Sequence, residues 1–415
     1  MNTSAPIPRF VALKHRNFSL LWSGLIVSNV GTWMQNVAQN WLVLQLTNSP
    51  LWLGMLGLSF AIPMVVLPFV GGVVVDRINR VRLLVVTQTG QMLIAFILAA
   101  LTWTHLINVW YILAGSFIGG SLLAFDNPAR QALVPDLVPG DHLLNAMSLN
   151  AATYNGAALV GPALAGVLLQ PLGAGTLFFI NGVSFLAVLI ALLAMRDVRT
   201  QSGGAQASLH RSALKGLGYA WRNRLILALL CLSAVAAVFG RSYQNLLSIF
   251  GRDIWHAGPT GYGLLLSAAG GGALVGAFGL ASIRKLRRHG ALMIGIGLLF
   301  CLSIILFAIS PTLVLGCLLL FIAGVTSTAF GTIIATFIQV ESPNELRGRI
   351  MSLYTITLIG LPSLGALASG AVAQALGGIP GAPRAVLIGG ILAGLFVIVL
   401  APFFWKREID TANRR

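Results

Sequence analysis

Apolar residues in this chain form long, unbroken runs and do not alternate with polar residues. Each run is long enough for a helix of about 20 residues, the length that crosses the hydrocarbon core of a bilayer. The strands of a membrane barrel would alternate instead, so a barrel is a poor alternative. With Pro, Gly and charged residues taken as boundaries, the pattern predicts twelve transmembrane helices, at 18–46, 51–75, 83–104, 108–127, 143–170, 175–195, 224–250, 260–283, 291–309, 312–339, 349–376 and 384–405.

Composition and the placement of charge fit such a membrane protein. Of the 415 residues, 57% are hydrophobic and 9% are charged, with a mean hydropathy of +0.88. Soluble chains carry about 25% charged residues. The net charge of +16 does not indicate a nucleic-acid binder, because most Lys and Arg residues fall in alternate loops on one side of the predicted helices. The positive-inside rule makes that side cytoplasmic and places both termini there.

The predicted helices form two groups of six. The pattern predicts a cytoplasmic tail at 1–17, a first bundle at 18–195, a cytoplasmic linker at 196–222, a second bundle at 223–405 and a tail at 406–415. PGDHLLNAMSL, from residue 139, and PNELRGRIMSL, from residue 343, share a proline, an acid and Met-Ser-Leu at equal spacing. A duplicated six-helix unit is typical of the parallel repeats of major facilitator transporters. The expected fold class is therefore an all-α membrane protein of two six-helix pseudo-repeat bundles.

The loop after the second predicted helix reads GGVVVDRINRVR, at 71–82. This spacing of glycine, aspartate and arginines resembles the signature of the major facilitator superfamily. The resemblance implies a conformational latch that joins the two halves at the cytoplasmic side and favours the outward-open state, with Arg77 or Arg80 paired to Asp126. The latch residues are then Gly72, Asp76, Arg77, Arg80 and Asp126. A topology signal that only keeps the loop inside is the alternative.

Two further segments bear on this resemblance. In the second half, Ile283 stands where the aspartate would be, so only one latch is expected to be complete. FDNPARQALVPDLVP, at 125–139, is similar to the exporter branch that includes the enterobactin exporter and macrolide efflux pumps. A glycine–proline pattern in the fifth helix resembles a motif of drug–proton antiporters and implies a bend, with ordinary close packing as the alternative. Its residues are Gly161, Pro162 and Gly166.

Polar side chains inside the predicted helices mark candidate substrate residues. Amides face lipid only at high cost, so they are expected to face a central cavity or another helix. The first helix and its counterpart by repeat, the seventh, each carry a polar stripe at helical spacing. The candidates are Asn29, Trp33, Asn36, Gln39, Asn40, Tyr154, Arg241, Gln244 and Asn245. Interhelical hydrogen bonding without substrate contact is the alternative for the amides. Arg241 either receives an anionic group of the substrate or is held by amides and carbonyls.

Acidic residues give little sign of an ion-coupling site. All ten Asp and Glu residues lie at or beyond the ends of predicted helices. Asp126 is the remaining candidate for a coupling residue, and proton antiport is implied by the resemblance alone. The sequence contains no GxxxxGKS or GxxxxGKT phosphate-binding loop, no nucleophile–base set and no metal-ligand spacing. The protein is therefore expected not to be an enzyme and to use no cofactor or metal.

These observations predict a secondary active transporter that exports amphipathic small molecules, such as drugs, macrolides or siderophores, by alternating access. A lipid or lysolipid transporter, and a receptor or assembly protein that transports nothing, are the alternatives. The expected partners are a small-molecule substrate, protons and membrane lipids, without nucleic acid, and the chain is expected to be a monomer. The resemblance to bacterial exporters implies the inner membrane.

Overall fold

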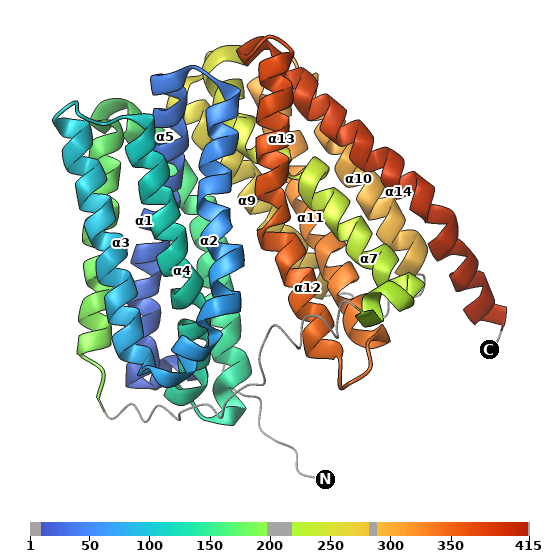
Figure 1. Ribbon diagram of the computed structural model, residues 1–415, viewed down its shortest axis with the longest axis horizontal. Coiled ribbons are helices and arrows are strands. Elements are labelled where there is room, and N and C mark those ends of the chain that lie inside the picture. Colours follow the sequence, from blue (N-terminus) through green and yellow to red (C-terminus); the bar gives the residue numbers. More distant parts are fainter. Residues whose placement is uncertain (1–9, 197–217, 282–288, 414–415) are drawn as a thin grey trace.

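A computed structural model describes residues 10–196, 218–281 and 289–413, without the side chains of 68–77, 280–281, 289 and 405–413. The labelled elements of these ranges are all helical (Figure 1). The first half contains η1 (Val11–Lys14), α1 (Arg16–Thr47), α2 (Pro50–Arg77), α3 (Arg80–Trp103), α4 (Val109–Leu137) and α5 (Gly140–Leu193). The second half contains α7 (Arg224–Val235), η2 (Ala236–Gly240), η3 (Ser242–Leu246), α8 (Leu247–Ile249), η4 (Phe250–Ile254), α9 (Gly258–Ala281), α10 (His289–Ala308), α11 (Leu313–Glu341), α12 (Arg347–Ile359), α13 (Leu361–Ala375), η5 (Ile379–Gly381) and α14 (Ala382–Asn413).

The lengths and hydropathy of these helices suit a bilayer. Among the described residues, ten helical stretches are long and apolar enough to cross a membrane. The longest, α5, has 54 residues, or about 80 Å of helix, and Gly173 interrupts it with φ 74° and ψ 167°. Helix α1, with 32 residues, is also long enough but is too polar to be one of the ten. The all-α membrane fold is thereby confirmed, and the count of twelve stays a prediction.

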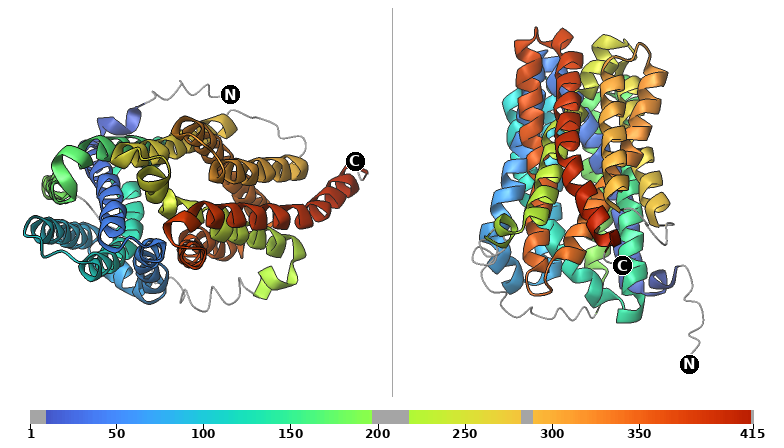
Figure 2. Two further views of the ribbon diagram at one scale, coloured as in Figure 1. Left: turned by 90° about the horizontal axis from the view of Figure 1, so that it is seen from above. Right: turned by 90° about the vertical axis from the view of Figure 1, so that its right-hand side faces the viewer.

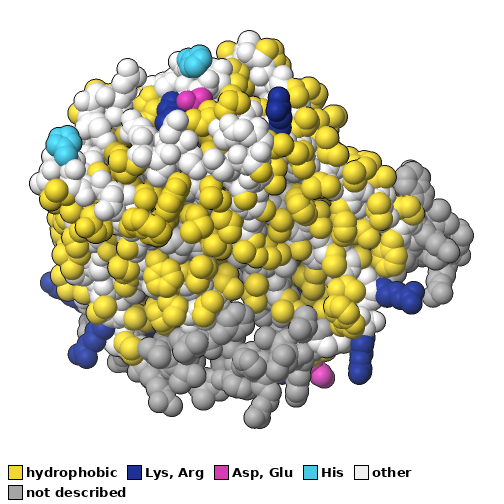
Figure 3. All heavy atoms as spheres, turned by 45° about the horizontal axis from the view of Figure 1, so that its top comes forward, with side chains coloured by type: hydrophobic (Ala, Val, Ile, Leu, Met, Phe, Trp, Pro, Cys, Tyr) yellow, Lys and Arg dark blue, Asp and Glu magenta, His cyan; other side chains and the backbone are white. Residues whose placement is uncertain are grey.

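Hydrophobic side chains cover the middle of the molecular surface. Figure 3 shows a broad apolar surface on which the charged side chains and histidines lie near the upper and lower margins. Large apolar residues such as Val86, Leu193 and Val399 are well exposed in the structure. Apolar side chains have no reason to avoid a surface that faces lipid, so this distribution is typical of a membrane-embedded bundle.

The helices of the two halves converge at one end of the molecule and diverge toward the other (Figures 1 and 2). We call the end at which α1 begins and α14 ends the terminal end, and the opposite end the distal end. Helices α2 and α5 of the first half pack against α13 and α9 of the second. Small residues permit this approach, because a Cβ on Gly54 would lie 2.7 Å from the Ala366 carbonyl oxygen and one on Gly166 would lie 3.0 Å from the Cα of Gly263.

In the second half, the eleventh predicted helix is divided and the twelfth extends further than predicted. The stretch predicted at 349–376 is divided into α12 and α13 at Gly360, directly before Leu361 and Pro362. Proline lacks the N–H that would continue the hydrogen-bond ladder, so a break at this point follows from the sequence. Helix α14 continues beyond residue 405, the predicted end of its membrane segment, to Asn413.

Candidate functional site

The chain predicted as the seventh transmembrane helix is irregular along most of its length. Helix α7 passes at Val235 into a π-helical turn, η2, which Arg241 separates from the 3₁₀ turn of η3. A second π-helical turn, η4, follows α8. Turns of this kind within membrane helices release backbone groups that neighbouring residues must satisfy, and they occur frequently at functional sites.

Hydroxyl groups and glycines support this irregular backbone. The Ser242 hydroxyl donates to the Phe239 carbonyl at 3.2 Å, and the Ser369 hydroxyl of α13 donates to the Ser242 carbonyl at 3.4 Å. Gly365 of α13 lies so close to the η2 turn that a Cβ there would overlap the carbonyl oxygen of Val238. The packing of α13 therefore fixes the position of the turn that precedes Arg241.

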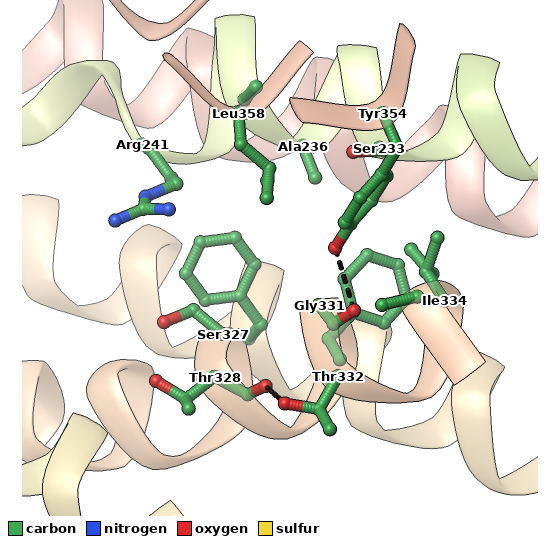
Figure 4. Close-up of a pocket in the computed structure, with 14 residues that line it drawn as sticks. Ser233, Ala236, Arg241, Ser327, Thr328, Gly331, Thr332, Ile334, Tyr354 and Leu358 are labelled. Carbon is green, nitrogen blue, oxygen red and sulfur yellow. Dashed lines mark hydrogen bonds between the residues drawn. The ribbon is translucent and has the colours of Figure 1, made fainter. Parts of the chain in front are cut away.

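A cavity of about 380 Å³ lies beside the irregular segment, between α7, η2, α10, α11 and α12 (Figure 4). Its polar lining consists of Ser233, Arg241, Ser327, Thr328, Thr332 and Tyr354, and its apolar lining includes Phe300, Phe330, Ile334 and Leu358. The Tyr354 hydroxyl donates to the Gly331 carbonyl at 2.7 Å, and the Thr332 hydroxyl donates to the Thr328 carbonyl at 2.9 Å. An apolar wall with a few polar groups is typical of small-molecule sites.

Arg241 is the cation of this cavity. Its guanidinium extends from the irregular segment toward α11 in Figure 4, and it forms no hydrogen bond or ion pair with any described side chain or backbone group. The phenol groups of Tyr154, Tyr243 and Tyr354 lie within its electrostatic range. Amides and carbonyls were one predicted set of partners for Arg241, and among the described residues none of them bonds to its guanidinium.

The polar residues predicted in the first helix occupy different environments along α1. Asn36 is exposed, whereas Gln39 is buried. Asn40 donates to the Asn36 carbonyl at 3.1 Å, and its buried Oδ1 has no partner. Asn29 and Trp33 are half-buried. Only part of this stripe is thus accessible from outside the helix packing.

The remaining cavity candidates lie near the seam between the halves. Asn245 packs on α2, because a Cβ on Gly57 would lie 2.8 Å from the Asn245 Nδ2. Gln244 is half-buried next to it in the chain. Tyr154 of α5 is 57% exposed, and its ring centroid lies 6.1 Å from that of Trp33. The pair forms an aromatic surface on the first half.

The glycine–proline pattern of α5 lies at helix contacts. A Cβ on Gly161 would lie 2.5 Å from the Trp33 Cβ, so this glycine lets α1 approach α5. Pro162 is buried at the contact with Gly263 of α9, and Gly166 packs on the same residue. The backbone departs from helical geometry at Gly173, beyond this pattern.

Asp126 lies in a polar cluster within the first half. The carboxylate is fully buried, with 0% exposure, and forms an ion pair with Arg130 one turn further along α4. Thr87 and Gln88 of α3 each donate to its Oδ1 at 2.8 Å. These contacts join α3 to α4 and use both carboxylate oxygens.

The latch predicted from the loop signature lies partly outside the described side chains. Gly72, Asp76 and Arg77 lie in the range 68–77, whose side chains the structure does not describe, so their predicted contacts are untested. Arg80 bonds to Asp136 at 2.5 Å and to the Ala132 carbonyl at 2.9 Å, and Asp126 is not its partner. The two aspartates are ten residues apart along α4, which is about 15 Å of helix. Arg80, at the start of α3, is therefore beside Asp136 and too far from Asp126 to pair with it.

The distal end is closed by contacts between the halves. Arg252 of η4 donates to the Leu44 carbonyl at 3.0 Å and to the Asn48 side chain, at the end of α1, while it also pairs with Asp253. Nearer the middle, the Ser267 hydroxyl donates to the Leu159 carbonyl at 2.8 Å. Among described residues, the hydrogen bonds between the halves all lie from this level toward the distal end.

A second cavity, of about 530 Å³, lies at this closed end. Its lining comes from α1, α5 and the turn before α9 and includes Trp41, Gln45, Gln170 and His256. It lies on the seam, so its shape depends on the closure of the distal end. In the described part of the chain, no group of three or more His, Cys, Asp or Glu residues could hold a metal ion.

Several of these site residues were missed in the sequence. The α11 hydroxyls show a usable signal, because Thr328, Thr332 and Thr336 recur every four residues on one face of an apolar helix. Arg252 shows none, because its partners are a backbone carbonyl and an amide about 200 positions earlier in the chain.

Comparison with known proteins places this architecture in context. Residues 7–414 match the family described as transmembrane secretion effector, a branch of the major facilitator superfamily. The chain is 24% identical to the multidrug efflux pump Tap of Mycolicibacterium fortuitum, over 95% of this chain and 97% of that protein. It is 24% identical to the enterobactin exporter EntS of Shigella flexneri, over 80% of each chain. A shorter match, 28% identical, covers 39% of this chain and 42% of the staphyloferrin A transporter of Staphylococcus aureus.

Solved structures share the fold. A bacterial homologue of the human lysosomal transporter Spinster superposes with a TM-score of 0.70 at 16% identity, over 99% of both chains. The nucleoside transporter NupG superposes with a TM-score of 0.73 at 15% identity, over 96% of this chain and 100% of that one. Both similarities concern the fold alone.

Proposed function

Because the chain belongs to the transmembrane secretion effector family of major facilitator transporters, we propose that it exports amphipathic small molecules of the drug, macrolide or siderophore type. It is a multi-pass membrane transporter and not an enzyme. We place it in the bacterial inner membrane as a monomer surrounded by lipid, with the terminal end in the cytoplasm. The named relatives support this proposal, since they are exporters or transporters of such compounds.

One observation carries the proposal: the seam is closed at the distal end, while a mixed polar and apolar cavity lies beside the broken helix. A carrier that takes its cargo from the cytoplasm needs this arrangement in one of its two states. The polar groups at Arg241 and the apolar wall of Phe300 and Phe330 together suit a cargo with both characters.

We further propose that protons drive export through Asp126. Protonation would remove the charge that pairs with Arg130 and would weaken the carboxylate as an acceptor for Thr87 and Gln88. The contact between α3 and α4 would then loosen. A proton could in this way change the relative position of two helices of the first half.

The test is uptake of a panel of fluorescent amphiphiles into inverted membrane vesicles with an imposed proton gradient. Wild-type protein is expected to accumulate at least one panel member. Asp126→Asn is expected to lose gradient-driven uptake and to keep substrate counterflow, which needs alternation but no coupling ion. The matched control, Asp141→Asn, removes an exposed acid at the start of α5 and should behave as wild type.

Three outcomes would contradict the proposal in different ways. Gradient-driven uptake by Asp126→Asn would exclude Asp126 as the coupling residue. Loss of both uptake and counterflow would mean that Asp126 is structural. Failure of inserted wild-type protein to move any panel member would contradict export of amphiphiles and would make lipids the next substrates to test.

A further inference from the structure

We propose that Arg241 binds the anionic group of the transported molecule, so that the cargo is an amphipathic anion. This inference rests on the proposed function and narrows its substrate class. Arg80, Arg130 and Arg252 each form an ion pair with an aspartate, whereas the Arg241 guanidinium has no carboxylate partner in the described chain.

A cation without a partner at membrane depth is costly and rare, and such residues usually face a cavity in which a ligand or ion binds. Arg241 meets this description, because its cavity has no carboxylate in its lining. The described acids outside the three ion pairs are Asp141, Glu341 and Glu345, which are exposed at helix ends. The neutralising charge must therefore come from outside the described protein.

The surroundings of Arg241 suit an oxyanion. A guanidinium presents paired N–H donors that match carboxylate, sulfonate or phosphate oxygens. Ser327 and Thr328 line the same cavity on the facing turn of α11 (Figure 4), and hydroxyl groups serve as additional donors to an anion. The volume of about 380 Å³ is sufficient for a small organic anion.

Aromatic and aliphatic side chains near Arg241 could contact the apolar part of the transported molecule. Tyr154 lies within electrostatic range of Arg241 although it belongs to the opposite half, and its exposed ring stands beside Trp33. Phe300 and Leu358 line the cavity on the other side. An anion with an apolar or aromatic body would therefore contact both halves, with its charge on Arg241.

The test compares two probes that share one ring system. 8-Anilinonaphthalene-1-sulfonate carries the anion, and N-phenyl-1-naphthylamine lacks it. Affinities are measured by equilibrium dialysis on the purified full chain in lipid nanodiscs, with empty nanodiscs as the blank. Arg241→Gln is expected to weaken sulfonate binding by roughly ten- to a hundredfold, the range for a lost hydrogen-bonded charge, and to leave binding of the neutral probe unchanged.

Two further variants complete the design. Arg241→Lys keeps the charge and should retain part of the preference for the sulfonate. Arg384→Gln removes an exposed arginine at the distal end and should change neither affinity. The neutral probe reports whether each variant is folded. If Arg241→Gln binds neither probe, the result for Arg241→Lys is used instead. Equal affinity of Arg241→Lys for the two probes would overturn the proposal.

Failure here is distinguishable from failure of the proposed function. Sulfonate binding that is as tight in Arg241→Gln as in wild type, or no tighter than binding of the neutral probe in wild type, would overturn the anion site. Export of uncharged amphiphiles in vesicles would still stand. Conversely, Arg241-dependent sulfonate binding without any vesicle transport would support the site and contradict the exporter.

Discussion

At the scale of single residues, glycines determine how closely helices approach. Gly161 faces the Trp33 Cβ, which cannot move without moving the backbone of α1. Gly156, five positions earlier in α5, has no atom within 4 Å of the place where a Cβ would be. A Gly→Ala substitution at each of these two positions therefore distinguishes the effect of helix packing on stability from the effect of helix propensity.

We predict that Gly161→Ala lowers the free energy of unfolding by about 1–3 kcal/mol, the usual cost of overpacking. Gly156→Ala should leave it unchanged or raise it by up to about 1 kcal/mol, because alanine is the better helix former. Thermal unfolding followed by tryptophan fluorescence in one detergent measures both. Equal midpoints for the two variants would show that α1 and α5 do not meet closely at Gly161.

At the scale of elements, the broken seventh helix depends on its neighbour α13. Gly365 admits the Val238 carbonyl and Ser369 donates to the Ser242 carbonyl, so α13 supports the turns on both sides of Arg241. A side chain at Gly365 would push the two elements apart and disturb the backbone groups of the turns, which are costly to leave unpaired in a membrane.

We predict that Gly365→Ala speeds amide exchange in the peptide 236–246 by about tenfold, which corresponds to about 1.4 kcal/mol of lost local stability. Hydrogen–deuterium exchange mass spectrometry of the purified protein measures this rate. Gly295→Ala is the control, because a Cβ on that glycine of α10 would meet no atom within 4 Å. Unchanged exchange in Gly365→Ala would mean that α13 does not hold the π-helical turn.

At the scale of the whole molecule, the two halves meet at the distal end, and Arg252 joins them across the seam. Its bonds reach the last turn of α1 and the left-handed Asn48 that ends this helix. The arginine side chain is 20% exposed, so water competes with these bonds, and we expect them to contribute about 1 kcal/mol to closure.

We predict that Arg252→Gln raises the ratio of distal-open to distal-closed molecules about fivefold, as a loss of about 1 kcal/mol requires. Spin labels at Leu106 and Val314, both exposed near the distal end in opposite halves, report the opening as a longer distance in double electron–electron resonance. Arg384→Gln, at the same end, is the control. A distance distribution that is the same in Arg252→Gln and wild type would show that other contacts keep the distal end closed.

The sequence by itself determined the all-α membrane fold, because hydrophobic runs and helix breakers act locally and are legible in one dimension. The same holds for the choice of Arg241 as a residue of interest, since an arginine inside an apolar run is conspicuous. The break before Pro362, in contrast, falls inside a helix that was predicted to be continuous at 349–376. The sequence likewise identified most of the polar residues within helices as candidates, because they stand out from apolar surroundings.

Only the tertiary structure decided which residues meet. It paired Arg80 with Asp136 because both stand at the terminal end, and it surrounded Asp126 with Thr87, Gln88 and Arg130. It also broke the seventh helix, whose turns depend on α13, and joined Arg252 to α1. These contacts link segments far apart in the chain, and their geometry follows from helix packing, which no local pattern of residues encodes.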